Sequence, residues 1–281
     1  MKKLLIVSDM EGIAGIPMNQ FWATVPGHPL YFFKRRLLIK EIKASIRGAV
    51  RAGLKPEEIV VLDWHSTHHN FSQKEMPEGV TVIQKGETDF LKSGTIEKVF
   101  LIGFHAKAEI SVPIAHSMRY TIKTLKIKGK SIGEASLWAY VAGSMNIPIT
   151  LMTGDNFAVS EIRSLDMQTI CIETKNEKET PRPEDIYKKI EIAAEKAIHK
   201  TVLPLSTPSP FSISFSFKSA RLGEEMPEKY FTRREGEHII IEGKTAADVY
   251  DDFRDRVYAY IKTINPLRLI HAYSQIWKFD D

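Results

Sequence analysis

The sequence predicts an α/β fold, a three-layer sandwich in which a mostly parallel sheet lies between helices. Short and nearly continuous apolar runs recur along the first part of the chain, with stretches of helical periodicity between them. Such runs are typical of strands that are buried on both faces of a parallel sheet. Strand, helix and strand in repetition therefore indicate an α/β sandwich.

Five strands are expected in this sheet, each bounded by turn residues, and they cover residues 3–8, 58–64, 80–84, 98–104 and 149–154. Three helices are expected beside them, at residues 29–53, 131–146 and 184–200. The first helix ends at Gly53, because glycine suits the left-handed conformation that follows a helix. The second is stopped by Pro148, because proline cannot continue a helix.

A smaller C-terminal α+β subdomain is expected after residue 203. Three prolines between residues 204 and 210 mark the boundary, since proline enters neither a helix interior nor a central strand. Residues 211–217 then alternate strictly between apolar and serine side chains, as a half-buried antiparallel strand does. A short strand at 238–242 and an amphipathic helix at 245–264 follow. The predicted domains are therefore residues 1–203 and residues 204–281.

The composition is that of an ordinary globular protein. Its net charge of +4, from 39 basic and 35 acidic residues, gives no reason to expect nucleic acid as a partner, and the basic residues 34–36 are interpreted as a solvated helix face. Cys171 is the only cysteine, so neither an intramolecular disulfide nor a thiolate metal cluster is possible. No run approaches the roughly 18 apolar residues of a membrane span. The N-terminal apolar run is too short for a signal peptide, and we expect a cytoplasmic protein.

Two carboxylates follow the first predicted strand directly. Asp9 and Glu11 stand two residues apart, and Gly12 comes next. Ligands of open α/β sheets bind at the carboxyl edge of the strands, where these side chains are expected to lie. Two acids held close together repel each other unless a cation lies between them. An ordinary strand-ending turn remains the alternative, because Asp and Gly are common there.

Further potential metal ligands follow later strands. His65 and His105 each stand at the end of a predicted strand, and Glu134 opens a predicted helix. Carboxylate and imidazole together suit Zn²⁺, Mn²⁺ or Co²⁺, and the absence of thiolates favours a catalytic over a structural site. With Asp9 and Glu11 these ligands number five, more than one tetrahedral site requires, and carboxylates can bridge. The set therefore fits a two-metal site.

The order and spacing of several motifs resemble the zinc-dependent D-aminopeptidase family, peptidase family M55. The motifs are Ser8-Asp9-Met10-Glu11-Gly12, Asp63-x-His65-x4-Asn70, Gly103-x-His105-Ala106-Lys107-Ala108, His116-Ser117, Gly129-x3-Gly133-Glu134 and Thr153-Gly154-Asp155-Asn156. The resemblance covers roughly residues 1–175. It implies that the metal ligands are Asp9, Glu11, His65, His105 and Glu134, and that His116 is the catalytic histidine. It also implies ring-shaped homo-oligomers.

The sequence departs from the family pattern beside the first histidine motif. Trp64 and Ser66 replace a small residue and a glycine, and the indole could reshape the substrate pocket. His68 and His69 follow His65 at helical spacing and could bind metal independently, although neither matches a family ligand.

Two further residues of the motifs are candidates for substrate binding. Lys107 could bind an oxyanion or a substrate carboxylate; the alternative is that its side chain is simply solvated. Asp155 is the second candidate; the alternative is that it stabilises a loop and does not contact the substrate.

The resemblance implies an enzyme, a metal-dependent aminopeptidase with two zinc ions, acting on short peptides with an N-terminal D-residue. A two-metal amidohydrolase or phosphoesterase is the alternative enzyme, and a non-catalytic peptide-binding protein is the alternative outside enzymes. His116 argues against the non-catalytic protein, because it is not required as a metal ligand and is suited to act as a general base.

A closed homo-oligomer, a pentamer or a decamer of stacked rings, is expected from the resemblance and from the general preference for closed symmetry. The apolar face of residues 211–217, with Tyr273 and Trp277 near the C-terminus, offers surface for it. The alternative is that the chain's own helix at 245–264 covers that apolar face.

Overall fold

The computed structural model describes residues 2–264, and the chain forms two compact units. The first unit contains the chain up to Ala106, Val112–Ile114 and Ala135–Ser206. The second contains Lys107–Ser111, Ala115–Glu134 and the chain from Thr207 onward. The domain division after residue 203 stays a prediction, and two segments from the middle of the chain belong to the second unit.

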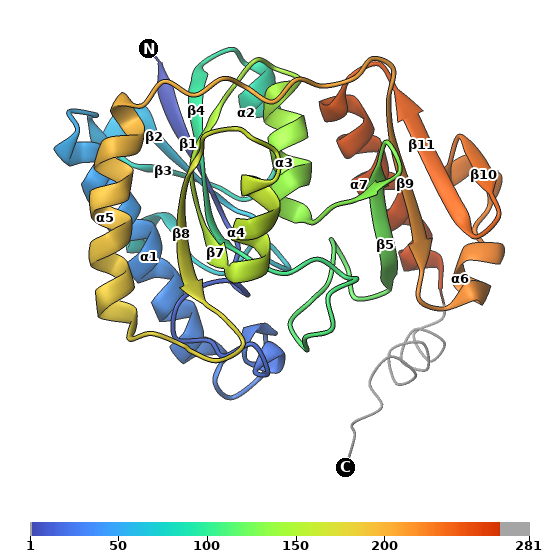
Figure 1. Cartoon of the computed structure of the whole chain (residues 1–281), viewed down its shortest axis with the longest axis horizontal. Helices are drawn as coiled ribbons and strands as arrows, with labels where there is room; N and C mark the ends of the chain where they lie inside the picture. Colours follow the sequence, from blue (N-terminus) through green and yellow to red (C-terminus); the bar gives the residue numbers. More distant parts are fainter. Residues whose placement is uncertain (1, 265–281) are drawn as a thin grey trace. The chain divides into compact units, whose positions relative to one another are not determined.

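The first unit is built on a six-stranded parallel sheet with the order β3-β2-β1-β4-β7-β8 (Figure 1). This confirms the predicted α/β fold and all five predicted strands. The sixth strand, β8, lies at the edge and was not predicted, because its apolar run ends at Ile172 and polar residues follow. The bounds are β1 (Lys3–Ser8), β2 (Ile59–Asp63), β3 (Thr81–Ile83), β4 (Ile96–Phe104), β7 (Ile149–Asp155) and β8 (Ile170–Lys175).

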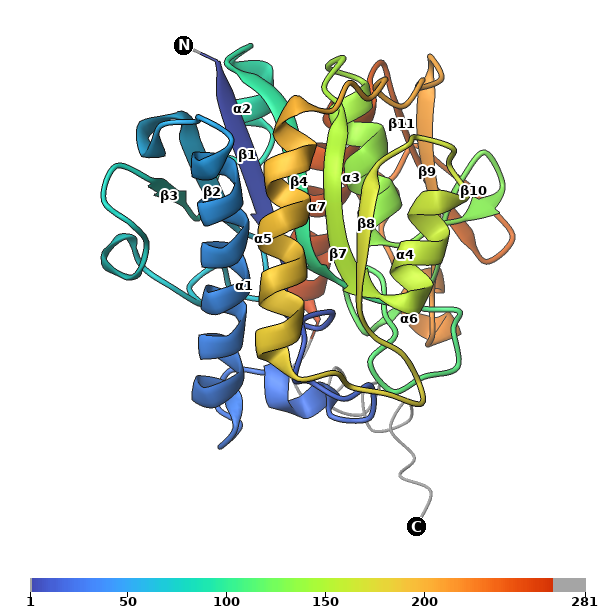
Figure 2. The same ribbon diagram turned by 60° about the vertical axis from the view of Figure 1, so that its left-hand side comes forward.

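Helices cover both faces of this sheet and complete the three layers. Helices α1 (Tyr31–Arg51) and α5 (Pro183–His199) lie on one face, and α3 (Glu134–Gly143) and α4 (Asn156–Arg163) lie on the other (Figures 1 and 2). Helices α1 and α5 approach closely at Gly48, where an added Cβ would lie 2.2 Å from the Glu191 carbonyl oxygen. The short helices of this unit are η1 (Phe21–Thr24), η2 (Pro56–Glu58), η3 (Gln73–Glu75) and α2 (Asp89–Lys92).

The second unit contains a five-stranded antiparallel sheet with the order β10-β11-β9-β5-β6. Two of its strands come from the middle of the chain and were not predicted, because the side chains of β5 do not alternate and its pairing with β9 contains an irregularity. The strands are β5 (Ile122–Ile127), β6 (Lys130–Ser131), β9 (Phe211–Phe217), β10 (Arg233–Glu235) and β11 (His238–Gly243). The helices are α6 (Ala220–Glu224), η4 (Glu228–Tyr230) and α7 (Ala246–Thr263).

The apolar face of β9 is covered within its own unit. Phe215 contacts Phe253 of α7 edge to face, with ring centres 5.0 Å apart, and both rings are buried. The alternative expected from the sequence is therefore correct, and this strand leaves no apolar surface for a partner. Tyr273 and Trp277 lie outside the described residues. Over residues 2–264, no helix has both the length and the apolar character needed to cross a membrane.

Candidate metal centre

Three strand ends carry the predicted ligands of the first unit to one edge of its sheet. β1 lies between β2 and β4, and Ser8 pairs with Asp63 on one side and with Ile102 on the other. Since the strands are parallel, the residues that follow them leave the sheet at the same edge. Asp9, His65 and His105 therefore come together from separate parts of the sequence, as predicted.

Two glycines let the loops after β1 and β4 approach backbone to backbone. Gly12 donates its N–H to the Gly103 carbonyl oxygen at 2.8 Å. An added Cβ at Gly12 would lie 1.7 Å from the carbonyl oxygen of Phe104, and one at Gly103 would lie 2.2 Å from that of Asp9. Gly103 also has a φ of +82°, which L-residues rarely adopt. Any side chain at either position would push the two loops apart.

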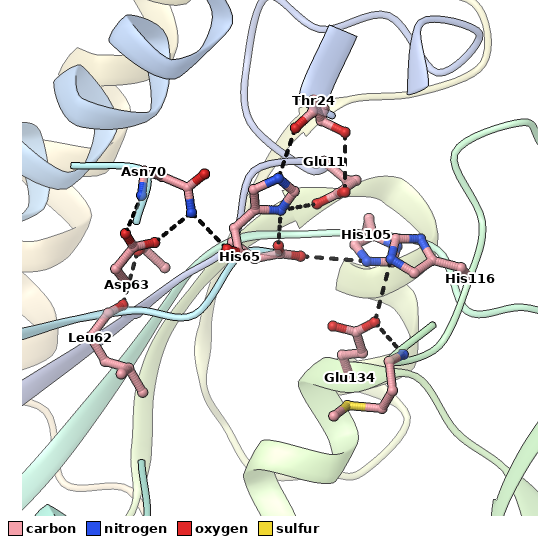
Figure 3. Close-up of polar contacts among 12 residues, drawn as sticks. Glu11, Thr24, Leu62, Asp63, His65, Asn70, His105, His116 and Glu134 are labelled. Atoms are coloured by element: carbon pink, nitrogen blue, oxygen red, sulfur yellow. Dashed lines mark hydrogen bonds and ion pairs between the residues drawn. The ribbon is translucent and has the colours of Figure 1, made fainter. Parts of the chain in front are cut away.

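Asp9 lies between the two histidines and directs one carboxylate oxygen to each. His65 Nδ1 is 3.2 Å from Asp9 Oδ1, and His105 Nε2 is 3.4 Å from Asp9 Oδ2 (Figure 3). All three side chains are at most 5% exposed. Asp9 therefore offers one carboxylate oxygen to each imidazole.

Each imidazole is oriented by a backbone carbonyl on its other nitrogen. His65 Nε2 donates to the Thr24 carbonyl oxygen at 2.9 Å (Figure 3). His105 Nδ1 donates to the Ala106 carbonyl oxygen at 2.9 Å. In neutral imidazole these bonds leave the lone pairs of His65 Nδ1 and His105 Nε2 directed toward Asp9. Metal-binding histidines in proteins are held in this way.

Glu11 supplies a second carboxylate to the same cluster. Its Oε2 lies 3.0 Å from His65 Nδ1, and its Oε1 accepts a hydrogen bond from Thr24 Oγ1 at 3.2 Å. Ligand atoms of Asp9, Glu11 and His105 all lie within 4.8 Å of one another. This set of two carboxylates and imidazole nitrogens suits zinc.

The two carboxylates also affect the protonation of His65. Burial alone would lower this pKa, but the carboxylates of Glu11 and Asp9 outweigh it and hold the pKa of His65 well above its ordinary value. A cation that binds between these groups replaces that proton and its charge.

Asn70 fixes the loop that carries His65. Its side-chain nitrogen donates to Asp63 Oδ1 at 2.7 Å and to the His65 carbonyl oxygen at 2.6 Å. Its side-chain oxygen accepts from the Tyr31 hydroxyl at 2.6 Å, and its backbone N–H donates to Asp63 Oδ2. The spacing of Asp63, His65 and Asn70 was the only sequence signal for this role, and nothing in the sequence pointed to Tyr31.

A buried lysine holds the loop that carries Glu11. Lys175, at the end of β8 and 1% exposed, donates to the carbonyl oxygens of Glu11 and Ile16. Burial lowers the pKa of Lys175 to about 8, against the opposing effect of Asp155 and Glu41. Sequence reasoning missed this residue because it missed the strand that places it.

Two residues of α1 hold the same loop further along. Glu41 accepts from the Ala14 N–H at 2.6 Å, and burial raises the pKa of Glu41 to about 7. Lys34 donates to the Gly15 carbonyl oxygen at 2.5 Å and is only 7% exposed. The interpretation of residues 34–36 as a solvated face is therefore wrong for Lys34, because its ammonium binds the loop instead.

The second unit brings His116 and Glu134 together. His116 Nε2 lies 3.8 Å from Glu134 Oε1, which also accepts the Met118 N–H at 2.6 Å (Figure 3). The His116 ring stacks on Tyr120, with ring centres 4.2 Å apart. Glu134 is the first residue of α3, so it begins the helix whose other residues belong to the first unit.

The two candidates for substrate binding contact the backbone. Both oxygens of Asp155 accept backbone N–H groups, from Ala106 at 2.7 Å and from Ala158 at 2.9 Å. These bonds favour a loop-holding role for Asp155, which is fully buried. Lys107 donates to the Ser131 carbonyl oxygen at 2.9 Å within the second unit. Their roles in substrate binding stay predictions.

The departures beside His65 also have a structural explanation. Trp64 is 7% exposed and contacts Phe104 and Trp138, with ring centres 5.7 and 5.6 Å away, so its indole forms part of the core. Ser66 has a φ of 53°, a conformation that favours the glycine it replaces.

The two histidines that follow His65 have different surroundings. His68 Nε2 lies 3.6 Å from Glu87 Oε1, and the His69 side chain is exposed. Within the described residues, neither belongs to a cluster of three possible metal ligands.

The sandwich and its cluster define an α/β protein with a group of possible metal ligands at the carboxyl edge of a parallel sheet. The model of the D-aminopeptidase family, peptidase family M55, matches residues 1–254, and the chain belongs to this family. A D-aminopeptidase of Bacillus subtilis (strain 168) is 29% identical over 167 residues, which span 58% of this chain and 60% of that relative.

A solved structure shows the same fold. The chain is similar to the zinc-dependent D-aminopeptidase DppA from Bacillus subtilis, described as a self-compartmentalizing protease, with a TM-score of 0.80 and 23% identity. The match covers 92% of this chain and 98% of that chain. The α/β sandwich predicted from the sequence is therefore a known architecture of this family.

Proposed function

We propose that the protein is a zinc-dependent aminopeptidase that hydrolyses short peptides, with a preference for a D-residue at the amino end. The observation that carries the proposal is the pair of buried imidazoles, each fixed by a backbone carbonyl and directed at a different oxygen of Asp9. Membership of the D-aminopeptidase family and the name of the B. subtilis relative support the peptide substrate and the D-residue. Cytoplasmic location stays a prediction.

The proposed ligands are Asp9, Glu11, His65, His105 and Glu134, at the positions where the family motifs match. Two ions are proposed, because Asp9 faces two imidazoles and a single ion needs fewer ligands than this set provides. Zinc is the metal named for the structural relative, and manganese and cobalt suit the same donors. Bound zinc ions would lower the pKa of a water molecule and polarise the scissile carbonyl group.

His116 is proposed to move the proton during hydrolysis. Its imidazole would accept a proton from the attacking water and donate it to the leaving amine, as a general base and then a general acid. Glu134 Oε1, 3.8 Å from His116 Nε2, stabilises the protonated imidazole electrostatically. The stack on Tyr120 holds the ring plane while the charge changes.

A chromogenic screen tests the proposal against its alternatives. Protein treated with EDTA and then with Zn²⁺ is given D-alanyl-para-nitroanilide, its L-isomer and para-nitrophenyl phosphate. We expect hydrolysis of the D-anilide only after zinc is restored, slower hydrolysis of the L-isomer and none of the phosphate. Hydrolysis that survives chelation would exclude a metal mechanism, and preferential phosphate release would make the protein a phosphoesterase.

We also propose a closed homo-oligomer, a ring of five chains or two stacked rings. The description of the structural relative as self-compartmentalizing supports this assembly. Large apolar side chains exposed at the start of α1 offer surface for it, since Phe32 is 70% and Phe33 is 58% exposed. Light scattering should give about five or ten times the 32.0 kDa chain mass. A species of one chain mass would contradict the ring and leave the chemistry untouched.

A further inference from the structure

In the second unit, a lysine lies over the tyrosine ring that stacks on the proposed catalytic histidine. Lys218 directly follows β9, and its backbone N–H donates to the Thr121 carbonyl oxygen at 2.8 Å. This bond keeps it next to the segment that carries Tyr120. Its Nζ lies 5.6 Å from the centre of the Tyr120 ring, and that ring stacks on His116 at 4.2 Å with a 24° angle between the planes. The ammonium group and the imidazole are thus less than about 10 Å apart.

The positive charge of Lys218 has no carboxylate partner in the part of the chain that the structure describes. Lys123 of the same unit, by contrast, pairs with Glu237 at 3.0 Å. Lys218 is also partly removed from water, and this burial lowers the pKa of its ammonium group. A partly buried cation without a counter-ion is unfavourable, and an anionic ligand would offset that cost.

We propose that Lys218 binds the C-terminal carboxylate of the substrate, so that the enzyme prefers dipeptides with a free carboxyl group. This inference rests on the proposed peptidase function and on the role of His116 in protonating the leaving amine. One residue spans about 3.3–3.6 Å, so the carboxylate of a dipeptide stays close to that amine. A lysine within about 10 Å of the imidazole can therefore reach it.

Two other cationic side chains of the second unit already have interaction partners. Arg119 lies over the Tyr258 ring, with its guanidinium carbon 3.6 Å from the ring centre, and Lys107 donates to the Ser131 carbonyl oxygen. Lys218 instead lies over the Tyr120 ring and, among the described residues, has no side-chain hydrogen bond to a backbone carbonyl. It would act as a specificity-determining residue, since it touches the substrate away from the bond that breaks.

The test compares D-alanyl-D-alanine with its C-terminal amide on the zinc-loaded full-length protein. The two substrates share the scissile bond and differ only in the charge that Lys218 would bind. We expect kcat/KM of the wild type to be about 10- to 100-fold higher for the free acid, the range that a hydrogen bond to a charged group contributes, mostly through KM. In K218M this ratio should fall close to one, and K218R should keep a preference for the acid.

The matched control is K229M. Lys229 also lies over a tyrosine ring, 4.8 Å from the centre of Tyr230, but it is exposed and plays no part in the proposed site. Its variant should keep the wild-type ratio. A wild type that does not distinguish acid from amide, or a K218M that still does, would overturn the inference. Failure of the wild type to hydrolyse either compound would instead contradict the proposed function, so the two failures are distinguishable.

Discussion

Replacement of Asp9 by asparagine is expected to remove metal binding and, with it, peptide hydrolysis. Asparagine keeps the shape of the side chain but loses the negative charge and one of the two oxygens that face His65 and His105. Removal of a group that only orients a ligand already costs about 10–100-fold in metal affinity, so loss of the proposed ligand itself should cost at least about 100-fold. Calorimetric titration with zinc and metal analysis of the purified variant measure this effect.

The control for Asp9→Asn is the same change at Asp166. That aspartate is exposed and has a φ of 54°, a conformation that asparagine tolerates well. Asp166→Asn should bind zinc and hydrolyse substrate as the wild type does. Full metal content in Asp9→Asn would show that Asp9 is no ligand, and the proposed centre would then be wrong.

Replacement of His116 by alanine is expected to lower kcat by about 10²–10⁴-fold while zinc binding is kept, because a positioned acid–base group contributes that much. The imidazole lies 3.8 Å from Glu134 and stacks on Tyr120. Steady-state kinetics and zinc titration of the same preparation separate turnover from metal binding.

His238→Ala is the control for that variant. His238 belongs to the same unit, at the start of β11, and its Nε2 lies 3.4 Å from Lys126 Nζ. Its removal should leave kcat unchanged. Should His116→Ala lose zinc together with activity, His116 would be a ligand, and the proton transfer would need another residue.

The sequence by itself determined the layered α/β architecture of the first unit. Its strands are continuous apolar runs because both faces of a parallel sheet are buried, and this local pattern is visible without tertiary information. It also predicted that Asp9, Glu11, His65 and His105 meet, since each follows a strand and parallel strands end at one edge. The structure places these four side chains together in the first unit, as expected.

Tertiary structure alone decided which residues support these groups. Thr24, Tyr31 and Lys175 reach the cluster through contacts across 39 to 164 residues of sequence, and no local pattern distinguishes them from other polar residues. Strand β5 was not predicted for a similar reason, because its side chains do not alternate and its pairing with β9 stabilises it.

The position of Lys218 over the Tyr120 ring follows from that same pairing of β5 with β9. Hydrogen bonding between distant strands brings side chains together according to register, which the sequence of either strand alone does not specify. Sequence motifs therefore identify the candidate ligands at the strand ends. The residues that orient those ligands, and the residue proposed to recognise the substrate, are brought into place only by long-range pairing in the folded chain.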